Sequence, residues 1–142
     1  MGEQTATLAA ETKALKEAYA ALNRNDIPAM LTAFDPELEW SDPPSAPGAG
    51  TYRGLAVVQA HLSRARSTWA EGSCEPERFI VAGDKIVVFV HVHVRLKGAT
   101  DWIEARMADV CTFRNGLAVQ MRSFEDRRQA LEWAGAPASA EN

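Results

Sequence analysis

The stretch KIVVFVHVHVRL, Lys85–Leu96, decides the fold class of this chain. Its side chains alternate in character, as they do along a β-strand, where successive residues point to opposite faces of the sheet. One face carries only the aliphatic residues Ile86, Val88, Val90, Val92 and Val94. The other face carries Val87, Phe89, His91, His93 and Arg95. The aliphatic face is predicted to meet a layer of helices, and the mixed face to lie on the far side of the sheet.

Further β-rich runs surround this strand along the chain. Together with it, strands are predicted at residues 37–42, 77–83, 85–96, 102–113 and 117–125. Gly83-Asp84 and Asn115-Gly116 separate neighbouring runs tightly enough to form hairpin turns. The last four strands are therefore expected to form an antiparallel meander.

Helices are predicted where apolar residues recur every three or four positions. They are expected at residues 5–24, 27–34, 54–69 and 127–134. Asp26 with Pro28 close behind it is a typical helix start, and Asp126 with Gln129 resembles a capping box. The segment PPSAPGAG, residues 43–50, can be neither helix nor central strand, so it is predicted to be a surface loop.

This order of elements predicts an α+β fold in which helices cover one face of a curved antiparallel sheet. A chain of 142 residues is expected to form a single domain, with its core at about residues 8–134 and a disordered tail at 135–142. The net charge of −4, with scattered basic residues, argues against a nucleic-acid partner. No apolar run reaches the roughly 20 residues of a membrane span, and the N-terminal segment lacks the features of a secretory signal. We therefore expect a cytoplasmic protein without a membrane partner.

One residue breaks the apolar face of the strand at residues 102–113. Its core-facing set is Ile103, Ala105, Met107, Asp109, Cys111 and Phe113. An aspartate among apolar side chains is unfavourable unless it is paired, hydrogen-bonded or protonated. Two alternatives follow. Either a bulge or another register turns Asp109 to solvent, or its carboxyl group lies in a cavity that raises its pKa and keeps it neutral as a hydrogen-bond donor.

The outer face of the sheet carries the pair His91 and His93. With Phe89, this half-polar surface is suited to a homodimer interface. An H-x-H pair can also bind a metal, but no third ligand stands at a convincing spacing, so neither a metal nor a cofactor is expected. Cys74 and Cys111 have no paired spacing for zinc or a disulfide framework and are predicted to be small buried residues.

Several segments together resemble the nuclear transport factor 2-like superfamily, in its branch of SnoaL-like and ketosteroid isomerase-like proteins. They are AYAALNRND (18–26), FDPELEWSDP (34–43), YRG (52–54), FRNG (113–116) and MRSFED (121–126). The resemblance covers about residues 8–134 and implies a cone-shaped sheet of the cystatin-like roll type. It specifies the chemistry poorly, because this superfamily includes isomerases, cyclases, epoxide hydrolases and binding proteins.

Ketosteroid isomerases combine a general-base Asp with an oxyanion hole made of a Tyr and a protonated Asp. The resemblance implies that Asp42, which precedes Pro43 at the end of the first strand, matches the base. Asp before Pro is also a common turn opener, so this alternative stays open for Asp42. Asp109 stands four residues before Phe113, as the oxyanion Asp of the family stands to its aromatic residue.

The match departs from the family pattern in two helices. The position of the catalytic Tyr is Ala18 here, and Tyr19 follows about 100° further around the helix, so it either lines the cavity or points away from it. His61 falls on an aromatic pocket position and would add an acid/base group, although a lone histidine on a helix is often structural. The side chains expected around a substrate are Tyr19, Trp40, Tyr52, Val90, Val92, Met107, Cys111 and Met121.

The leading hypothesis is a cofactor-free enzyme that acts on a small hydrophobic carbonyl compound through an enolate, as an isomerase or an aldol-type cyclase. In it Asp42 or His61 takes a proton from carbon, and neutral Asp109 donates a hydrogen bond to the enolate oxygen. A second hypothesis is a non-catalytic dimeric module that binds a hydrophobic ligand. A third is epoxide hydrolysis, whose Asp-Arg-Asp signature is broken here: Trp40 and Asp42 replace its Tyr and Asn, and Ser123 falls near one expected Asp.

Overall fold

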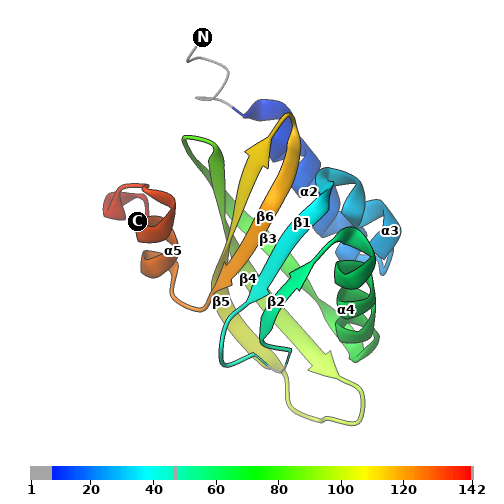
Figure 1. The fold of residues 1–142 in the computed structure, drawn as a ribbon. Helices are drawn as coiled ribbons and strands as arrows, with labels where there is room; N and C mark the ends of the chain where they lie inside the picture. The colour runs from blue at the N-terminus through cyan, green and yellow to red at the C-terminus, as the bar shows by residue number, and fades with distance from the viewer. Residues whose placement is uncertain (1–7, 47, 142) are drawn as a thin grey trace.

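The computed structural model describes residues 8–46 and 48–141. Its helical segments are α2 (Ala9–Asn23), α3 (Ile27–Met30), the 3-10 helix η1 (Leu31–Ala33), α4 (Leu55–Ser67), α5 (Arg127–Ala134) and the 3-10 helix η2 (Ala138–Glu141). Helices α2, α3 and α4 lie on one face of a curved sheet, and α5 lies on the other (Figure 1). The predicted α+β class, with N-terminal helices against a curved sheet, is confirmed.

Six strands form one sheet. They are β1 (Phe34–Asp42), β2 (Gly50–Arg53), β3 (Trp69–Ala82), β4 (Lys85–Leu96), β5 (Ile103–Arg114) and β6 (Leu117–Phe124). Their order across the sheet is β2-β1-β6-β5-β4-β3, and β1 and β6 are parallel whereas the other neighbours are antiparallel. The sheet is therefore mixed, and the prediction of a wholly antiparallel sheet is wrong at this one pair. Alternation along a strand fixes its faces but not the direction of a distant partner.

The bounds of β4 and α5 are those that the sequence predicted. Strand β3 is longer than predicted, because it begins at Trp69 and continues through Pro76. Proline is tolerated there since β3 is an edge strand, and its register with β4 shifts between Pro76 and Arg78. Strand β2 was not predicted; it pairs with the end of β1.

The N-terminal helices differ from the prediction at their ends. Helix α2 begins at Ala9, and residues 5–7 of the predicted helix lie outside the described residues. The side chain of Asp26 caps α3 as predicted, by accepting a hydrogen bond from the backbone N–H of Ala29. The helix predicted at 27–34 ends earlier, because Phe34 is extended and opens β1. No described helix is long and apolar enough to cross a membrane.

Hydrophobic side chains pack on both faces of the sheet. Ile86, Val88 and Val90 of β4 join the inner cluster beneath α2, α3 and α4. Val87 and Phe89 join an outer cluster beneath α5. The predicted alternation of β4 therefore holds, and both of its faces are covered over the first half of the strand.

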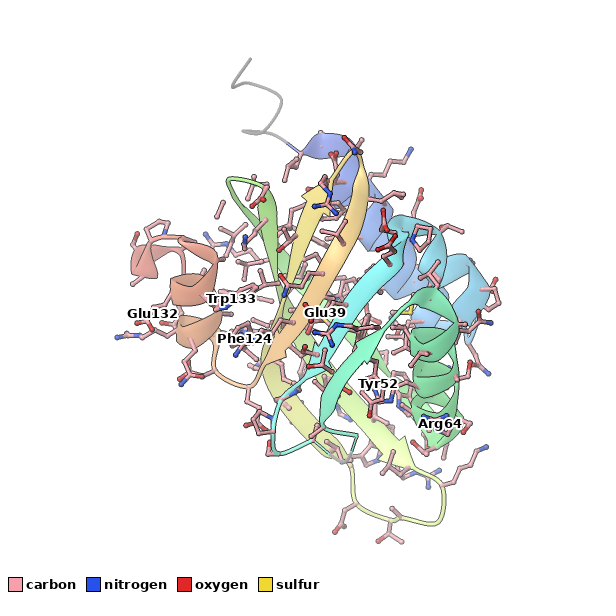
Figure 2. All side chains as sticks on the ribbon, viewed as in Figure 1. Glu39, Tyr52, Arg64, Phe124, Glu132 and Trp133 are labelled. Atoms are coloured by element: carbon pink, nitrogen blue, oxygen red, sulfur yellow. The ribbon has the colours of Figure 1, made fainter. Side chains whose placement is uncertain are left out.

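Helix α5 covers part of the outer face that was expected to form a homodimer. Trp133 of α5 packs toward Phe124, with ring centres 5.8 Å apart (Figure 2). Phe89 lies beneath this helix and is 3% exposed, so its predicted place in a dimer interface is wrong. His91 and His93 lie beyond the helix on the same face. Dimerisation through that remaining surface stays a prediction.

Candidate active site

A cavity of about 170 Å³ lies between the N-terminal helices and the inner face of the sheet. Its walls come from α2, α3, α4 and five of the strands, and most of their side chains are apolar. The oxygen-bearing side chains that line it are Tyr19, Asp109 and Ser123. The cavity is thus a hydrophobic chamber with one polar end.

The side chains expected around a substrate line this cavity, with one exception. Those that line it are Tyr19, Trp40, Val90, Val92, Met107, Cys111 and Met121. Tyr52 is not among the lining residues. Asp109 lines the cavity, whereas Asp42 and His61 do not. Ile103, which was expected to face the core, is the first residue of β5 and is 47% exposed.

Asp109 is held by two hydroxyl groups from different elements. Tyr19 of α2 donates a hydrogen bond of 2.5 Å to Oδ2 of Asp109. Ser123 of β6 donates to Oδ1, since it lies directly across from Asp109 in the pairing of β5 with β6. The bulge that would have turned Asp109 to solvent is not present, because Asp109 pairs in regular register with Val88 on its other side. Tyr19 therefore reaches the cavity.

The cavity raises the pKa of each titratable group that lines it. Burial is the main cause of the raised pKa of Asp109; the hydrogen bonds from Ser123 and Tyr19 lower that pKa, and the charge of Asp42 raises it. Burial, followed by the charge of Asp109, also raises the pKa of Tyr19 well above its usual range. The same two causes raise the pKa of Cys74 to about 12 and that of Cys111 further. The phenol and both thiols are therefore neutral at physiological pH.

Asp42 and His61, both predicted to be catalytic, meet behind the cavity wall. Nε2 of His61 lies 2.6 Å from Oδ2 of Asp42. The indole Nε1 of Trp40 donates a hydrogen bond of 2.9 Å to Oδ1 of Asp42. Both carboxylate oxygens are therefore engaged, and Trp40 stands between this pair and the cavity that it lines. Asp42 itself borders a separate polar groove that also includes Arg122.

His61 lies between the ring of Tyr52 and the backbone of Gly48. The ring of Tyr52 stacks on the imidazole at 3.9 Å, and the Tyr52 hydroxyl donates a hydrogen bond of 2.7 Å to the carbonyl oxygen of Gly48. A Cβ atom at Gly48 would come within 2.7 Å of Cε1 of His61, so only glycine fits there without a shift. Tyr52, expected to contact substrate, thus orients His61. The imidazole is 7% exposed.

Ser123 lines the cavity, although it was predicted only to fall near an Asp of the epoxide hydrolase pattern. Its signal was nevertheless present, because alternation along β6 puts Ser123 on the same face as Met121, which was predicted to line the site. Leu15, Met30 and Leu62 also line the cavity and were not predicted to do so. Apolar residues on helices could not be told from ordinary core residues by their spacing alone.

Solved structures share this fold. An NTF2-like protein of unknown function from Burkholderia pseudomallei is 26% identical, with a TM-score of 0.73 over 90% of this chain and 99% of that one. An NTF2-like protein from Burkholderia xenovorans is 29% identical, with a TM-score of 0.69 over 88% of this chain and 95% of that one. A protein with a ketosteroid isomerase-like fold from Catenulispora acidiphila, solved in complex with trimethylamine, is 19% identical, with a TM-score of 0.67 over 91% of this chain and 95% of that one. At that identity the likeness shows the fold alone.

The sequence matches no curated protein. A family model described as a SnoaL-like domain matches residues 15–121. This segment begins within α2, ends within β6 and contains both Tyr19 and Asp109. The fold, the arrangement of the cavity between helices and sheet, and this match agree, and the chain belongs to the SnoaL-like domain family.

Proposed function

We propose that this protein is an acid/base enzyme that acts on a small hydrophobic carbonyl compound through an enolate, as an isomerase or an aldol-type cyclase. One observation carries the proposal. Among the described residues that line the cavity, Asp109 is the one titratable group whose pKa burial shifts toward neutral pH, whereas the raised pKa values of Tyr19, Cys74 and Cys111 lie further from it and keep those groups protonated. A raised pKa makes a carboxylate a stronger base, which suits Asp109 to take up a proton and return it.

The mechanism uses the contact between Asp109 and Tyr19. Asp109 takes a proton from the carbon next to the substrate carbonyl, and the electrons of the broken C–H bond form the enolate. Once the carboxylate is protonated, the hydroxyl of Tyr19 is free to donate its hydrogen bond to the enolate oxygen instead. Return of the proton to another carbon gives an isomer. Attack of the enolate carbon on a second carbonyl of the same molecule, with the proton passing to the new alkoxide, gives a ring.

This assignment moves the role of base from Asp42 or His61 to Asp109. A base has to come within hydrogen-bonding distance of the proton that it removes. Asp42 and His61 do not line the cavity, whereas Asp109 does. In the proposal Asp42 is a positioning residue: it holds the indole of Trp40 in the cavity wall and its charge raises the pKa of Asp109.

A non-catalytic module that binds a hydrophobic ligand is the second candidate. The largely apolar lining of the cavity favours it, because such walls bind a ligand without requiring chemistry. Epoxide hydrolysis gains no comparable support, since no arginine is found among the described residues that line the cavity.

The test is proton exchange in D2O, followed by NMR, with small cyclic ketones and β,γ-unsaturated enones as probes. We expect the wild type to accelerate exchange at the carbon next to the carbonyl. The variant Asp109→Asn should lose about 10²- to 10⁴-fold of this rate, because an amide cannot take up the proton. Asp101→Asn is the matched control, since Asp101 is exposed and does not line the cavity; it should keep the wild-type rate.

Two outcomes would count against the proposal. If Asp109→Asn exchanges the probes as fast as the wild type does, Asp109 is not the base. If probes bind and raise the melting temperature of the wild type but none of them exchanges, the binding module is the better description.

A further inference from the structure

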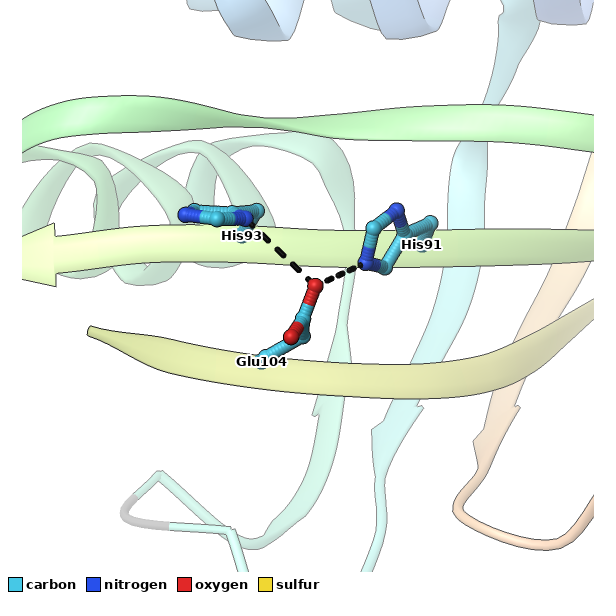
Figure 3. A group of neighbouring side chains, drawn as sticks. All are labelled: His91, His93 and Glu104. Carbon is cyan, nitrogen blue, oxygen red and sulfur yellow. Dashed lines mark hydrogen bonds and ion pairs between the residues drawn. The ribbon is translucent and has the colours of Figure 1, made fainter.

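A His-His-Glu cluster lies on the outer face of the sheet, on the side away from the cavity (Figure 3). His91 and His93 are alternate residues of β4 and point to the same side. Glu104 of β5 lies directly across from His93 in the pairing of the two strands. Its Oε2 is 2.8 Å from Nε2 of His91 and 3.5 Å from Nδ1 of His93. Within the described part of the chain this is the one trio of such side chains whose ligand atoms all lie within 4.8 Å of one another.

Glu104 is the third ligand, and it could not be recognised from its position in the sequence. An H-x-H pair was visible in the sequence, but Glu104 stands eleven positions after His93 with a turn between them. Only the register of β4 with β5 brings its carboxylate between the two imidazoles. The reason for expecting no metal, the lack of a third ligand, is thereby removed.

We propose that His91, His93 and Glu104 bind a divalent transition-metal ion such as Zn²⁺. Two imidazole nitrogens with one carboxylate suit zinc and its neighbours in the first transition row, whereas Mg²⁺ and Ca²⁺ prefer oxygen ligands throughout. Three protein ligands leave a position open for water or a small anion.

The two distances from Glu104 fit such an ion after a small adjustment, and all three ligand atoms lie within 4.8 Å of one another. Ligand atoms bound at about 2.1 Å in a tetrahedral arrangement lie about 3.4 Å apart. The distance from Glu104 to His93, 3.5 Å, is already close to this value. The 2.8 Å contact from Glu104 to His91 has to open by roughly half an ångström. The Glu104 side chain is 59% exposed and can make this shift, because an exposed ion pair holds its partners weakly.

The surroundings leave the cluster available to a cation. Arg106 and Arg95, whose positive charges would oppose an ion, are each bound to another carboxylate, Glu77 at 2.8 Å and Glu71 at 2.9 Å respectively. The ring of Trp102 meets the His93 ring edge to face at 4.4 Å between centres, which restricts the rotation of that imidazole. A bound ion would join β4 to β5 and should stabilise the sheet.

The test uses tag-free protein, so that no added histidines bind the ion. Titration calorimetry with ZnCl₂ is expected to show one ion bound per cluster, and the melting temperature should rise with zinc concentration. His93→Gln and Glu104→Gln should each weaken binding by about tenfold or more, and the double variant His91→Gln/His93→Gln should abolish the rise in melting temperature. Co²⁺ absorption in the visible range would report the number of ligands.

Glu37→Gln is the matched control, because Glu37 is an exposed carboxylate of β1, a strand that is not adjacent to β4 or β5, and it does not belong to the cluster. It should bind zinc as the wild type does. Circular dichroism verifies that each variant is folded before titration. The proposal is overturned if the folded wild type binds no zinc, or if the double histidine variant binds it as tightly as the wild type.

Discussion

At the scale of single residues, Asp109 is under two opposed influences. Burial disfavours its charged form, while the hydroxyls of Tyr19 and Ser123 favour that form; burial is the stronger, and the pKa is raised. The sequence indicated the core-facing side of the strand for Asp109, because strand alternation fixes the face to which a side chain points. It could not predict its partners, since Tyr19 stands 90 positions away and the contact depends on how α2 lies across the sheet. The pairing of Asp42 with His61 was hidden for the same reason.

The raised pKa of Asp109 makes the stability of the protein depend on pH. In the unfolded chain this carboxyl group titrates at about pH 3.9, and in the folded protein at a higher pH. Between these two values the folded state binds more protons, so the free energy of unfolding falls as the pH rises through the interval. The variant Asp109→Asn has no titratable group at this position, so its free energy of unfolding does not fall for this reason. We therefore expect its stability, relative to the wild type, to increase from about pH 4 up to the pKa of Asp109 in the folded protein. Urea denaturation over a pH series measures this, and parallel curves for the two proteins would contradict it.

At the scale of secondary-structure elements, the local sequence pattern predicted the bounds of an element correctly where strand alternation or a helix cap determines them. Strand β4 and helix α5 have the predicted bounds because alternation defines the one and the Asp126 cap defines the other. Strand β3 was predicted too short, since Gly72 and Pro76 are residues that usually interrupt strands. The parallel pairing of β1 with β6 could not be predicted, because it joins segments that are distant in the chain.

Gly72 is required by the close approach of β3 to β4. Its φ angle is +120°, and a Cβ atom there would lie 2.2 Å from the backbone oxygen of His93. Gly72→Ala should therefore lower the free energy of unfolding by about 2 kcal/mol or more, through backbone strain and displacement of the edge strand. Gly98→Ala is the control, because Gly98 also has a positive φ but open space around it, and about 1 kcal/mol is expected there. Chemical denaturation measures both, and equal losses would show that the contact with β4 is not the cause.

At the scale of the whole molecule, one sheet supports two hydrophobic layers of different kinds. The outer layer, between α5 and the sheet, includes Leu131 and Ala130 of α5, both fully buried. The inner layer contains the cavity, which leaves part of the surface of Leu15 and its neighbours without a packing partner. The sequence predicted the helix that became α5 but not its face, since a short amphipathic helix after the last strand can pack on either side.

Because the two layers lie on opposite faces of the sheet, we expect that a mutation in the outer layer lowers stability without changing activity. Leu131→Ala removes a fully buried side chain of the outer layer and should lower the free energy of unfolding by about 2 to 5 kcal/mol. Because α5 lies on the face opposite the cavity, the folded fraction should still exchange carbonyl probes at the wild-type rate. Leu15→Ala, a 2% exposed position that lines the cavity, should also destabilise the protein but change exchange, since the enlarged chamber holds a probe less firmly against Asp109. Denaturation curves and exchange rates measured below both melting transitions test the contrast. A loss of exchange in Leu131→Ala as large as that in Leu15→Ala would mean that the outer layer also shapes the cavity, and that the two faces of the sheet do not act independently.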